Sequence, residues 1–169
     1  MTQSLPAIEI AEFRTLMSHF PTGVAIVTTT GQDDSPRGMT VSSVCSVTLS
    51  PPTLLVCLRN GSPTLDAVLA RGAFAVNFLH GEAKPVAQLF ASGAPDRFDL
   101  VPWLLPPRAG GPHLVQDAHA VADCNVSRTE AVGDHTVVFG QAFGVAREQG
   151  LLPLLYGMRE YQVWRSDQG

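Results

Sequence analysis

The sequence has little charge and only one lysine. Charged residues make up 15% of its 169 residues, the net charge is −4, and Lys84 is the single lysine among eleven basic residues. The arginines are scattered, so no basic stripe offers the electrostatic surface that nucleic-acid binding requires. We therefore expect no nucleic-acid partner.

Long apolar runs and a targeting segment are also missing. The longest runs, such as LLVCL at 54–58, are far shorter than the roughly 20 residues of a membrane-spanning helix. The N-terminus shows neither the basic start nor the apolar core of a signal peptide. We expect no membrane association and a cytoplasmic protein.

Cysteines are few and unsuited to a metal site. Cys45, Cys57 and Cys124 are an odd number without CxxC spacing, and each lies in an apolar or β-like segment. This favours reduced core residues over a disulfide or a zinc site. The five histidines show no spacing typical of metal ligands, so we expect no bound metal.

The common catalytic motifs are absent as well. The sequence has no GxSxG, no HExxH, no GxxxxGK followed by Ser or Thr, and no GxGxxG after an expected strand. A hydrolase built from Ser and His remains conceivable, but such a triad is recognised by geometry and not by spacing.

What is present favours a mainly β protein in one domain spanning residues 1–169. Apolar periodicity predicts an amphipathic helix over 7–18, which should lie across an apolar surface, and further helices over 63–71 and 82–92. Residues 93–113, rich in proline, predict an ordered surface loop. β-rich runs predict strands over 24–30, 39–49, 53–58, 73–79, 119–132, 135–148 and 161–164. Hairpin connections without βαβ alternation favour a closed antiparallel barrel with peripheral helices.

One uncharged stretch, Gly38 to Leu58, carries many hydroxyls on segments that otherwise resemble core strands. Thr40, Ser42, Ser43, Ser46 and Thr48 do not follow a single period-2 face, so some point inward or lie at a bulge. A buried hydroxyl without a partner costs about 1–3 kcal/mol. Two interpretations remain open: the hydroxyls bind neighbouring backbone or face water, or they meet a flat polar ligand.

The next segment, RNGSPT, places Arg59 at a strand end and Ser62 and Thr64 at a predicted helix start. Free amides, hydroxyls and a guanidinium gathered there would suit a phosphate group. An ordinary helix N-cap explains the same residues.

In several segments the chain resembles the short-chain flavin reductases, which supply reduced flavin to two-component monooxygenases and share the FMN-binding split-barrel fold. The resemblance runs from Phe13 to Trp164. It is carried by FRTLMSHFPTGVAIVTT, GMTVSSVCSVTLSPPTLLVCL, SPTLDAVLARGAFAVNFL, PDRF, GDHTVVFGQ and PLLYGMREY, in that order. The implied fold is an antiparallel split β-barrel with peripheral helices.

The resemblance also implies roles for individual residues. It places His135 beside the nicotinamide, Arg97 near the flavin phosphate, and Tyr156 to Tyr161 near the nicotinamide site. The isoalloxazine ring and ribityl chain would lie against Met39, Thr40, Val41, Ser42, Ser43 and Ser46, and the phosphate against Cys57, Leu58, Arg59, Ser62 and Thr64.

The implied activity is that of an NAD(P)H:flavin oxidoreductase acting on FMN or FAD by hydride transfer. The implied partners are a flavin-dependent monooxygenase and a second copy of the chain. No basic cluster in the sequence clearly awaits a 2′-phosphate, which favours NADH while NADPH stays possible. Two rivals remain: a split-barrel flavoprotein that transfers electrons without turnover of free flavin, and a barrel adaptor that binds protein through 93–113.

Overall fold

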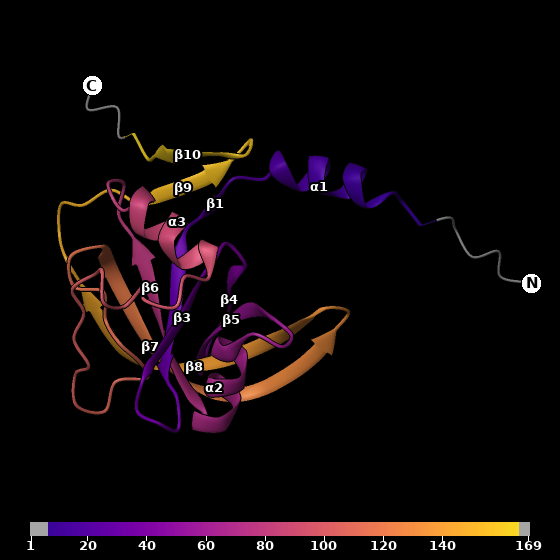
Figure 1. Ribbon diagram of the computed structural model, residues 1–169. Helices are drawn as coiled ribbons and strands as arrows, with labels where there is room; N and C mark the ends of the chain where they lie inside the picture. Colours follow the sequence, from indigo (N-terminus) through magenta and orange to yellow (C-terminus); the bar gives the residue numbers. More distant parts are fainter. Residues whose placement is uncertain (1–6, 166–169) are drawn as a thin grey trace, which may run out of the picture.

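The computed structural model describes residues 7–165, which form an antiparallel β structure with three helices at its surface (Figure 1). The elements in chain order are α1 (Ile10–Ser18), β1 (Thr22–Gly23), β2 (Ala25–Thr30), β3 (Pro36–Val41), β4 (Val44–Leu49), β5 (Pro52–Arg59), α2 (Pro63–Arg71), β6 (Ala73–Leu79), α3 (Lys84–Ser92), β7 (Ala118–Val132), β8 (His135–Arg147), β9 (Leu154–Gly157) and β10 (Glu160–Val163).

The main sheet has seven strands in the order β3-β2-β6-β7-β8-β5-β4. The expected closed barrel is wrong in one respect, because β3 and β4 are the two outer strands and do not pair with each other. The reason is a break at Ser42 and Ser43, which divides the single strand expected over 39–49 into β3 and β4. The curled but open sheet confirms the split-barrel fold class.

A second, three-stranded sheet has the order β1-β9-β10. Its strands are short, which explains why only the last of them was expected from the sequence. Thr22 of β1 pairs with Tyr156 of β9, and Tyr156 pairs in turn with Tyr161 of β10. Figure 1 shows this small sheet beside α3, at the end of the main sheet from which α1 extends. It therefore brings both ends of the described chain to one side of the barrel.

One core cluster lies inside the curled main sheet, and a second packs the sheet against α3 and the 93–113 segment through residues such as Ile26 and Phe90. All six residues of β2 are buried, and Phe74, Val76 and Val138 are fully enclosed. The Asn77 side chain is buried as well and donates to the Ile26 carbonyl, the Thr28 hydroxyl and the Pro112 carbonyl. These bonds satisfy a polar group that would otherwise be costly to bury.

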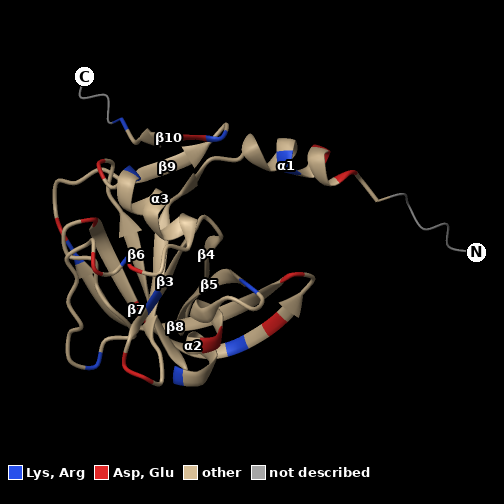
Figure 2. Ribbon diagram, in the orientation of Figure 1, with Lys and Arg blue, Asp and Glu red and all other residues tan. Residues whose placement is uncertain are grey.

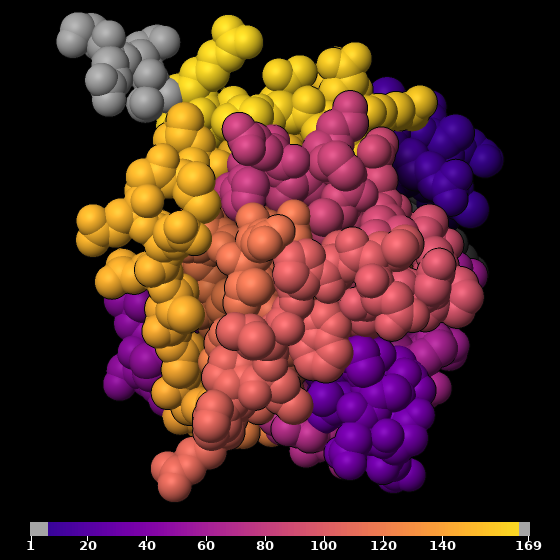
Figure 3. Space-filling view, turned by 60° about the vertical axis from the view of Figure 1, so that its left-hand side comes forward, coloured from indigo at the N-terminus to yellow at the C-terminus, as the bar shows by residue number. Residues whose placement is uncertain are grey.

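The proline-rich segment 93–113 is ordered, as expected, and covers one face of the molecule (Figure 3). It approaches the sheet so closely at Gly110 and Gly111 that a side chain would not fit. A Cβ at Gly110 would lie 2.1 Å from the Phe74 carbonyl oxygen, and one at Gly111 2.3 Å from that of Thr28. Asp123 anchors the segment by accepting from the Gly110 amide at 2.8 Å.

Helix α2 begins as the sequence predicts. The Ser62 hydroxyl accepts from the Leu65 amide at 3.2 Å, Pro63 occupies the first turn, and Gly72 ends the helix at φ 72°. This is the combination of N-cap, proline and left-handed glycine that favours a short helix.

Helix α1 differs from its expectation. It buries none of its residues and projects from the body of the protein (Figure 1). Its large apolar side chains, including Phe13 at 51% and Leu16 at 61% exposure, have no apolar surface beneath them within the described residues. Within residues 7–165, no helix combines the length and the apolar character that crossing a membrane would take.

Candidate functional site

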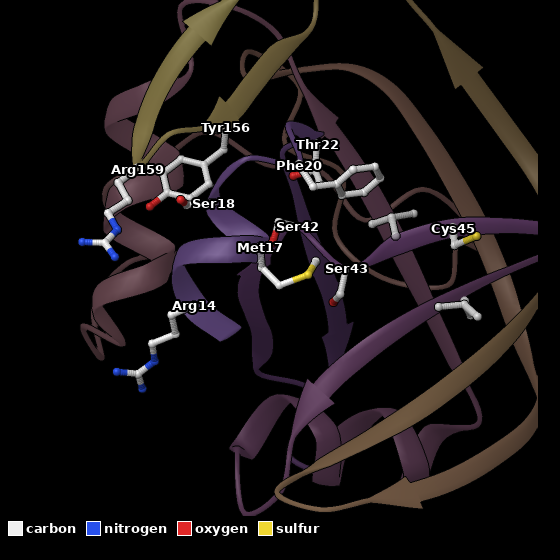
Figure 4. Close-up of a pocket in the computed structure, with 13 residues that line it drawn as sticks. Arg14, Met17, Ser18, Phe20, Thr22, Ser42, Ser43, Cys45, Tyr156 and Arg159 are labelled. Carbon is white, nitrogen blue, oxygen red and sulfur yellow. The ribbon is translucent and has the colours of Figure 1, made fainter. Parts of the chain in front are cut away.

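A cavity of about 710 Å³ lies where α1, the break between β3 and β4, and the small sheet meet (Figure 4). Each wall comes from a different part of the chain. The lining residues are Arg14, Met17, Ser18, Phe20, Thr22, Ser42, Ser43, Val44, Cys45, Leu55, Tyr156, Gly157 and Arg159. The cavity therefore exists only because the sheet is split at this point.

Ser42 is shared by three neighbouring cavities. It lines the large cavity and two neighbouring ones, of about 420 Å³ and 140 Å³. The first neighbour brings in Ser46, and the second brings in Thr40, Val41 and Tyr161. Together the three cavities form one groove along the split, which we call the split groove. It gathers seven of the predicted site residues: Thr40, Val41, Ser42, Ser43, Ser46, Tyr156 and Tyr161.

Two of the predicted hydroxyls serve the protein's own backbone. The Ser43 hydroxyl donates to the Cys57 carbonyl at 3.1 Å and accepts from the Cys57 amide at 3.2 Å. The Thr40 hydroxyl donates to the Ala87 carbonyl at 2.6 Å. For these two residues the simpler interpretation of the hydroxyl-rich stretch is correct, whereas Ser42 and Ser46 are exposed in the groove.

The groove also contains a buried hydroxyl without a partner. The Thr22 Oγ1 atom has no hydrogen bond within residues 7–165 although it is enclosed. Leaving such a group unpaired costs about 1–3 kcal/mol. A ligand with hydrogen-bonding atoms along its edge would relieve this cost. The polar rim of a flavin ring has that chemistry, so the donor set of the groove fits it.

Two tyrosines form the wall that faces Ser42 and α3. Tyr156 and Tyr161 have ring centroids 5.0 Å apart at an interplanar angle of 56°. Burial, and next the neighbouring Tyr156, raise the pKa of the Tyr161 phenol, so it stays protonated and can donate a hydrogen bond. Gly157, the residue after Tyr156, lies close to Pro21, since a Cβ at this position would be 3.0 Å from the Pro21 side chain.

His135 and Arg59 lie together outside the lining of the split groove. They are directly opposite each other in the β5–β8 ladder. The His135 Nδ1 atom is 2.8 Å from the Asp134 carboxylate, and this hydrogen bond is the main cause that lowers the pKa of Asp134. Arg59 is two residues beyond Cys57, so β5 connects this pair to the groove.

The remaining predicted residues have other surroundings. Leu58 is fully buried in the core, Met39 packs against it, and Thr64 is 1% exposed. Arg97 binds main-chain carbonyls, with Nε 3.0 Å from Gly38 and Nη1 2.6 Å from Ala94. Burial, and next Arg37, lower the pKa of Arg97. The Leu58 side chain therefore contacts the core, and Arg97 anchors the loop to β3.

Sequence reasoning predicted Tyr156 and Tyr161 of the small sheet but missed the site residues of α1 and Thr22 of β1. Arg14, Met17 and Ser18 follow helical i, i+3, i+4 spacing and share one face, which is the face turned to the groove. That spacing was visible, but nothing in the sequence said what the helix would face. Thr22 carried no signal because its strand is only two residues long. Arg159 was expected near the site only as part of the stretch 156–161, with no role of its own, and it lies in the turn between β9 and β10.

The expectation that all three cysteines are core residues is wrong for one of them. Cys124 is buried and Cys57 is half-buried, but Cys45 is exposed on β4 and lines the cavity. Its strand is an outer strand of the main sheet, so β4 pairs with a neighbour on one side only, and five of its six residues are exposed.

An open antiparallel barrel with a hydroxyl-lined groove at its split is the architecture of flavin-binding split barrels. A family model described as "Flavin reductase like domain" matches residues 17–165, and the chain belongs to this family. The chain is 49% identical over 157 residues to a flavin reductase (NADPH) of Lentzea aerocolonigenes, covering 93% of this chain and 91% of that protein.

Two further relatives extend the comparison. The chain is 33% identical over 156 residues to the flavin-dependent monooxygenase reductase subunit HsaB of Mycobacterium tuberculosis, covering 91% of this chain and 82% of that one. The structure superposes with a TM-score of 0.87 on the NADH:FAD oxidoreductase of Streptomyces globisporus, solved with NAD and FAD fragments. The two are 32% identical, with 94% of each chain covered.

Proposed function

We propose that the protein is an NAD(P)H:flavin oxidoreductase that reduces FMN or FAD and releases reduced flavin to a partner monooxygenase. The observation that carries the proposal is the split groove, where exposed hydroxyls and the unpartnered Thr22 Oγ1 line a ring-sized hollow in a chain of the flavin reductase family. The proposal takes residues 1–169 as one domain, supported by the family match over 17–165.

The residues of the groove would position two rings against each other. Ser42 and Thr22 would hold the edge of the flavin, and the helix start at Ser62, with Arg59 beside it, would hold its phosphate. The bound flavin supplies the hydride acceptor, N5. Hydride transfer requires reacting atoms about 3–3.5 Å apart, so positioning is the protein's main contribution. His135 would contact the nicotinamide, held in orientation by Asp134.

A homodimer is part of the proposal. Helix α1 leaves Ile10, Phe13 and Leu16 exposed, and the outer strand β4 exposes Val47 and Leu49 without any charged residue. Surfaces of this kind are normally covered, and two-fold assemblies are the commonest way to cover them. Light scattering should report twice the chain mass, and Leu16→Glu should shift the protein toward the monomer.

The proposal includes a monooxygenase partner and a cytoplasmic location. A monooxygenase partner is supported by the Mycobacterium tuberculosis relative, which is named as a reductase subunit of such an enzyme. A cytoplasmic location is supported by three cysteines that form no disulfide, as is usual in a reducing compartment.

The decisive experiment is a matrix of steady-state rates with NADH or NADPH and with FMN or FAD. We expect flavin-dependent oxidation of nicotinamide in at least one combination, with release of reduced flavin to solution. A protein that binds flavin tightly but turns over no free flavin would instead be an electron-transfer module.

Cys45 provides a test of the groove that does not depend on activity. Its thiol lines the cavity, whereas Cys124 is buried, so an alkylating reagent should modify Cys45 and spare Cys124. Added flavin should slow the modification of Cys45 if it occupies the groove. Unchanged labelling at saturating flavin would place the flavin elsewhere.

A further inference from the structure

Two arginines from opposite ends of the chain line the same side of the split groove. Arg14 belongs to α1 and Arg159 to the turn between β9 and β10, and both border the 710 Å³ cavity (Figure 4). The two segments are joined directly, because the Met158 amide donates to the Ser18 carbonyl at 2.6 Å. Arg14 and Ser18 are one helical turn apart, so this bond holds the two backbone segments that carry the arginines next to each other.

The turn that carries Arg159 has an unfavourable backbone for its sequence. Gly157 pairs with Glu160, which leaves Met158 and Arg159 as a two-residue hairpin turn with φ of 51° and 62°. Turns of this type favour Asn or Gly, because other side chains are strained at positive φ. Such strain tends to be kept where it serves a site.

The two guanidinium groups have no acidic partner in the part of the chain that the structure describes. Arg37 and Arg128, by contrast, form ion pairs with Asp33 and Glu130. Acidic residues also lie on the same two segments, Glu12 on α1 and Glu160 on β10, but within residues 7–165 neither forms an ion pair with Arg14 or Arg159. Figure 2 shows positive residues on α1 and at the β9–β10 turn on the same side of the molecule.

The adjoining surface adds a third cation and two phenols. A shallow hollow of about 600 Å³ next to the groove is lined by Arg159, Lys84, Tyr156 and Tyr161, with Glu160 as its one acidic residue. Lys84 is the only lysine of the chain, and its Nζ lies 5.9 Å from the centre of the Tyr161 ring. The rim therefore offers several hydrogen-bond donors to an anion.

We infer that Arg14 and Arg159 bind the 2′-phosphate of NADPH, so that this reductase prefers NADPH to NADH. The inference rests on the proposed function and names its coenzyme. A phosphate monoester carries nearly two negative charges near neutral pH and accepts paired N–H donors from guanidinium groups. Two arginines match that charge on a single phosphate. The coenzyme diphosphate carries the same total charge spread over two phosphates and is present in both coenzymes, so a comparison of NADPH with NADH distinguishes the two sites.

This inference departs from the preference for NADH that the sequence favoured. No basic cluster is visible in the sequence because its members lie in α1 and in the β9–β10 turn. The fold assembles the cluster. Both coenzymes occur among the relatives, since one is named for NADPH and another for NADH.

The test compares kcat/KM for the two coenzymes in Arg14→Gln, Arg159→Gln and the double variant. We expect the ratio of NADPH to NADH to fall about ten- to hundredfold, as for loss of a hydrogen bond to a charged group. Arg147→Gln, an exposed arginine of β8, is the matched control and should leave the ratio unchanged. An equal loss with both coenzymes would mean that the arginines bind the diphosphate and would overturn the inference, as would an unchanged ratio.

Two measurements test this inference independently of protein folding and of enzyme activity. Arg159→Gly relieves the left-handed backbone, so its Tm should rise while the preference for NADPH falls. Calorimetry should show adenosine 2′,5′-bisphosphate binding more tightly than adenosine 5′-monophosphate, with the difference lost in the double variant. If the parent oxidises neither coenzyme, the proposed function fails, and calorimetry alone decides whether the phosphate site exists.

Discussion

The Ser43 hydroxyl makes both a donor and an acceptor hydrogen bond with the main chain of Cys57, at 3.1 and 3.2 Å. It continues the β4–β5 ladder by one step at the point where the backbone of β4 leaves it, since Val44 and Val56 are the last residues paired there. The Ser43 side chain therefore extends the β4–β5 pairing up to the split of the barrel. The adjacent Ser42 remains exposed to the groove.

This relationship predicts that replacing Ser43 lowers stability, whereas replacing Ser42 weakens flavin binding. Ser43→Ala should lower the free energy of unfolding by about 1–3 kcal/mol, because it removes two hydrogen bonds. Ser42→Ala should change stability by less than about 0.5 kcal/mol, as for most exposed positions, yet weaken flavin binding. Urea unfolding and flavin titration of both variants measure the two effects. If Ser43→Ala leaves stability unchanged, the two bonds contribute nothing.

The sequence predicted most strands of the main sheet, because β-branched runs separated by turn residues are local signals. The pattern alone favoured a closed barrel, and the split barrel was implied only by the resemblance to the flavin reductases. The long hairpin of β7 and β8, with its turn at Gly133 and Asp134, is confirmed. The hydroxyl pattern predicted inward residues or a bulge in the stretch 38–58, and a bulge lies between Ser46 and Thr48. The break at Ser42 and Ser43 was not predicted, since residues 39–49 have continuous β character. It exists because β3 and β4 pair with different neighbours in the sheet, which is a tertiary property.

The candidate site was predicted unevenly for the same reason. Residues within the motifs, such as Ser42 and Tyr156, lie in the groove. Leu58 also lies within a motif and was predicted as a site residue, but strand alternation turns its side chain into the core. The pairing of Arg14 with Arg159 was missed, although Arg159 lies in the stretch 156–161 expected near the site, because their proximity depends on where α1 lies against the small sheet, and no spacing in the sequence encodes that.

The unpaired hydroxyl of Thr22 predicts a variant that is more stable and binds less well. Thr22→Val keeps the side-chain shape and removes the buried group without a partner, so the free energy of unfolding without ligand should rise by about 1 kcal/mol. Flavin affinity should fall if the flavin is the missing partner.

Thr29→Val is the matched control for this experiment. Its hydroxyl is also buried but donates to the Ala73 carbonyl at 2.9 Å. The same substitution there should destabilise the protein by about 1–3 kcal/mol, because a buried carbonyl loses its donor. If both variants lose stability alike, Thr22 has a partner that the groove itself provides.

His135 should matter for turnover and not for flavin binding. His135→Ala should lower kcat/KM for the nicotinamide about tenfold or more while the flavin Kd stays unchanged, as expected for loss of one contact to the coenzyme. Asp134→Ala should have a smaller effect in the same direction, because Asp134 orients the ring through a 2.8 Å bond. Its lowered pKa keeps the carboxylate charged across any assay near neutral pH.

Thr136→Val tests whether the hairpin, and not the imidazole, accounts for such losses. Thr136 follows His135 and its hydroxyl donates to the Asn60 side chain at 2.7 Å, so the variant loosens the same turn without touching the ring. We expect near-parental turnover from it. Parental turnover in His135→Ala with flavin still bound would remove His135 from the site.

Cys124 predicts how stability changes in alkaline solution. Burial, and next the negative charge of Asp123, raise the pKa of its thiol from 9.0 to about 12. The unfolded chain therefore loses this proton at a lower pH than the folded protein does. The contribution to stability is fully present below pH 9.0 and is lost as pH rises from there toward 12. Each pH unit within that window removes up to about 1.4 kcal/mol.

The measurement is the free energy of unfolding in urea at several pH values, for the parent and for Cys124→Ala. The variant is less stable at neutral pH because it leaves a small void in the core. The difference between the two proteins should nevertheless shrink above pH 9, since only the parent has the thiol to ionise on unfolding. Tyrosine and lysine titrate in this range as well, but they are common to both proteins and cancel in the difference. Parallel curves would mean that the Cys124 thiol ionises as readily in the core as in the unfolded chain.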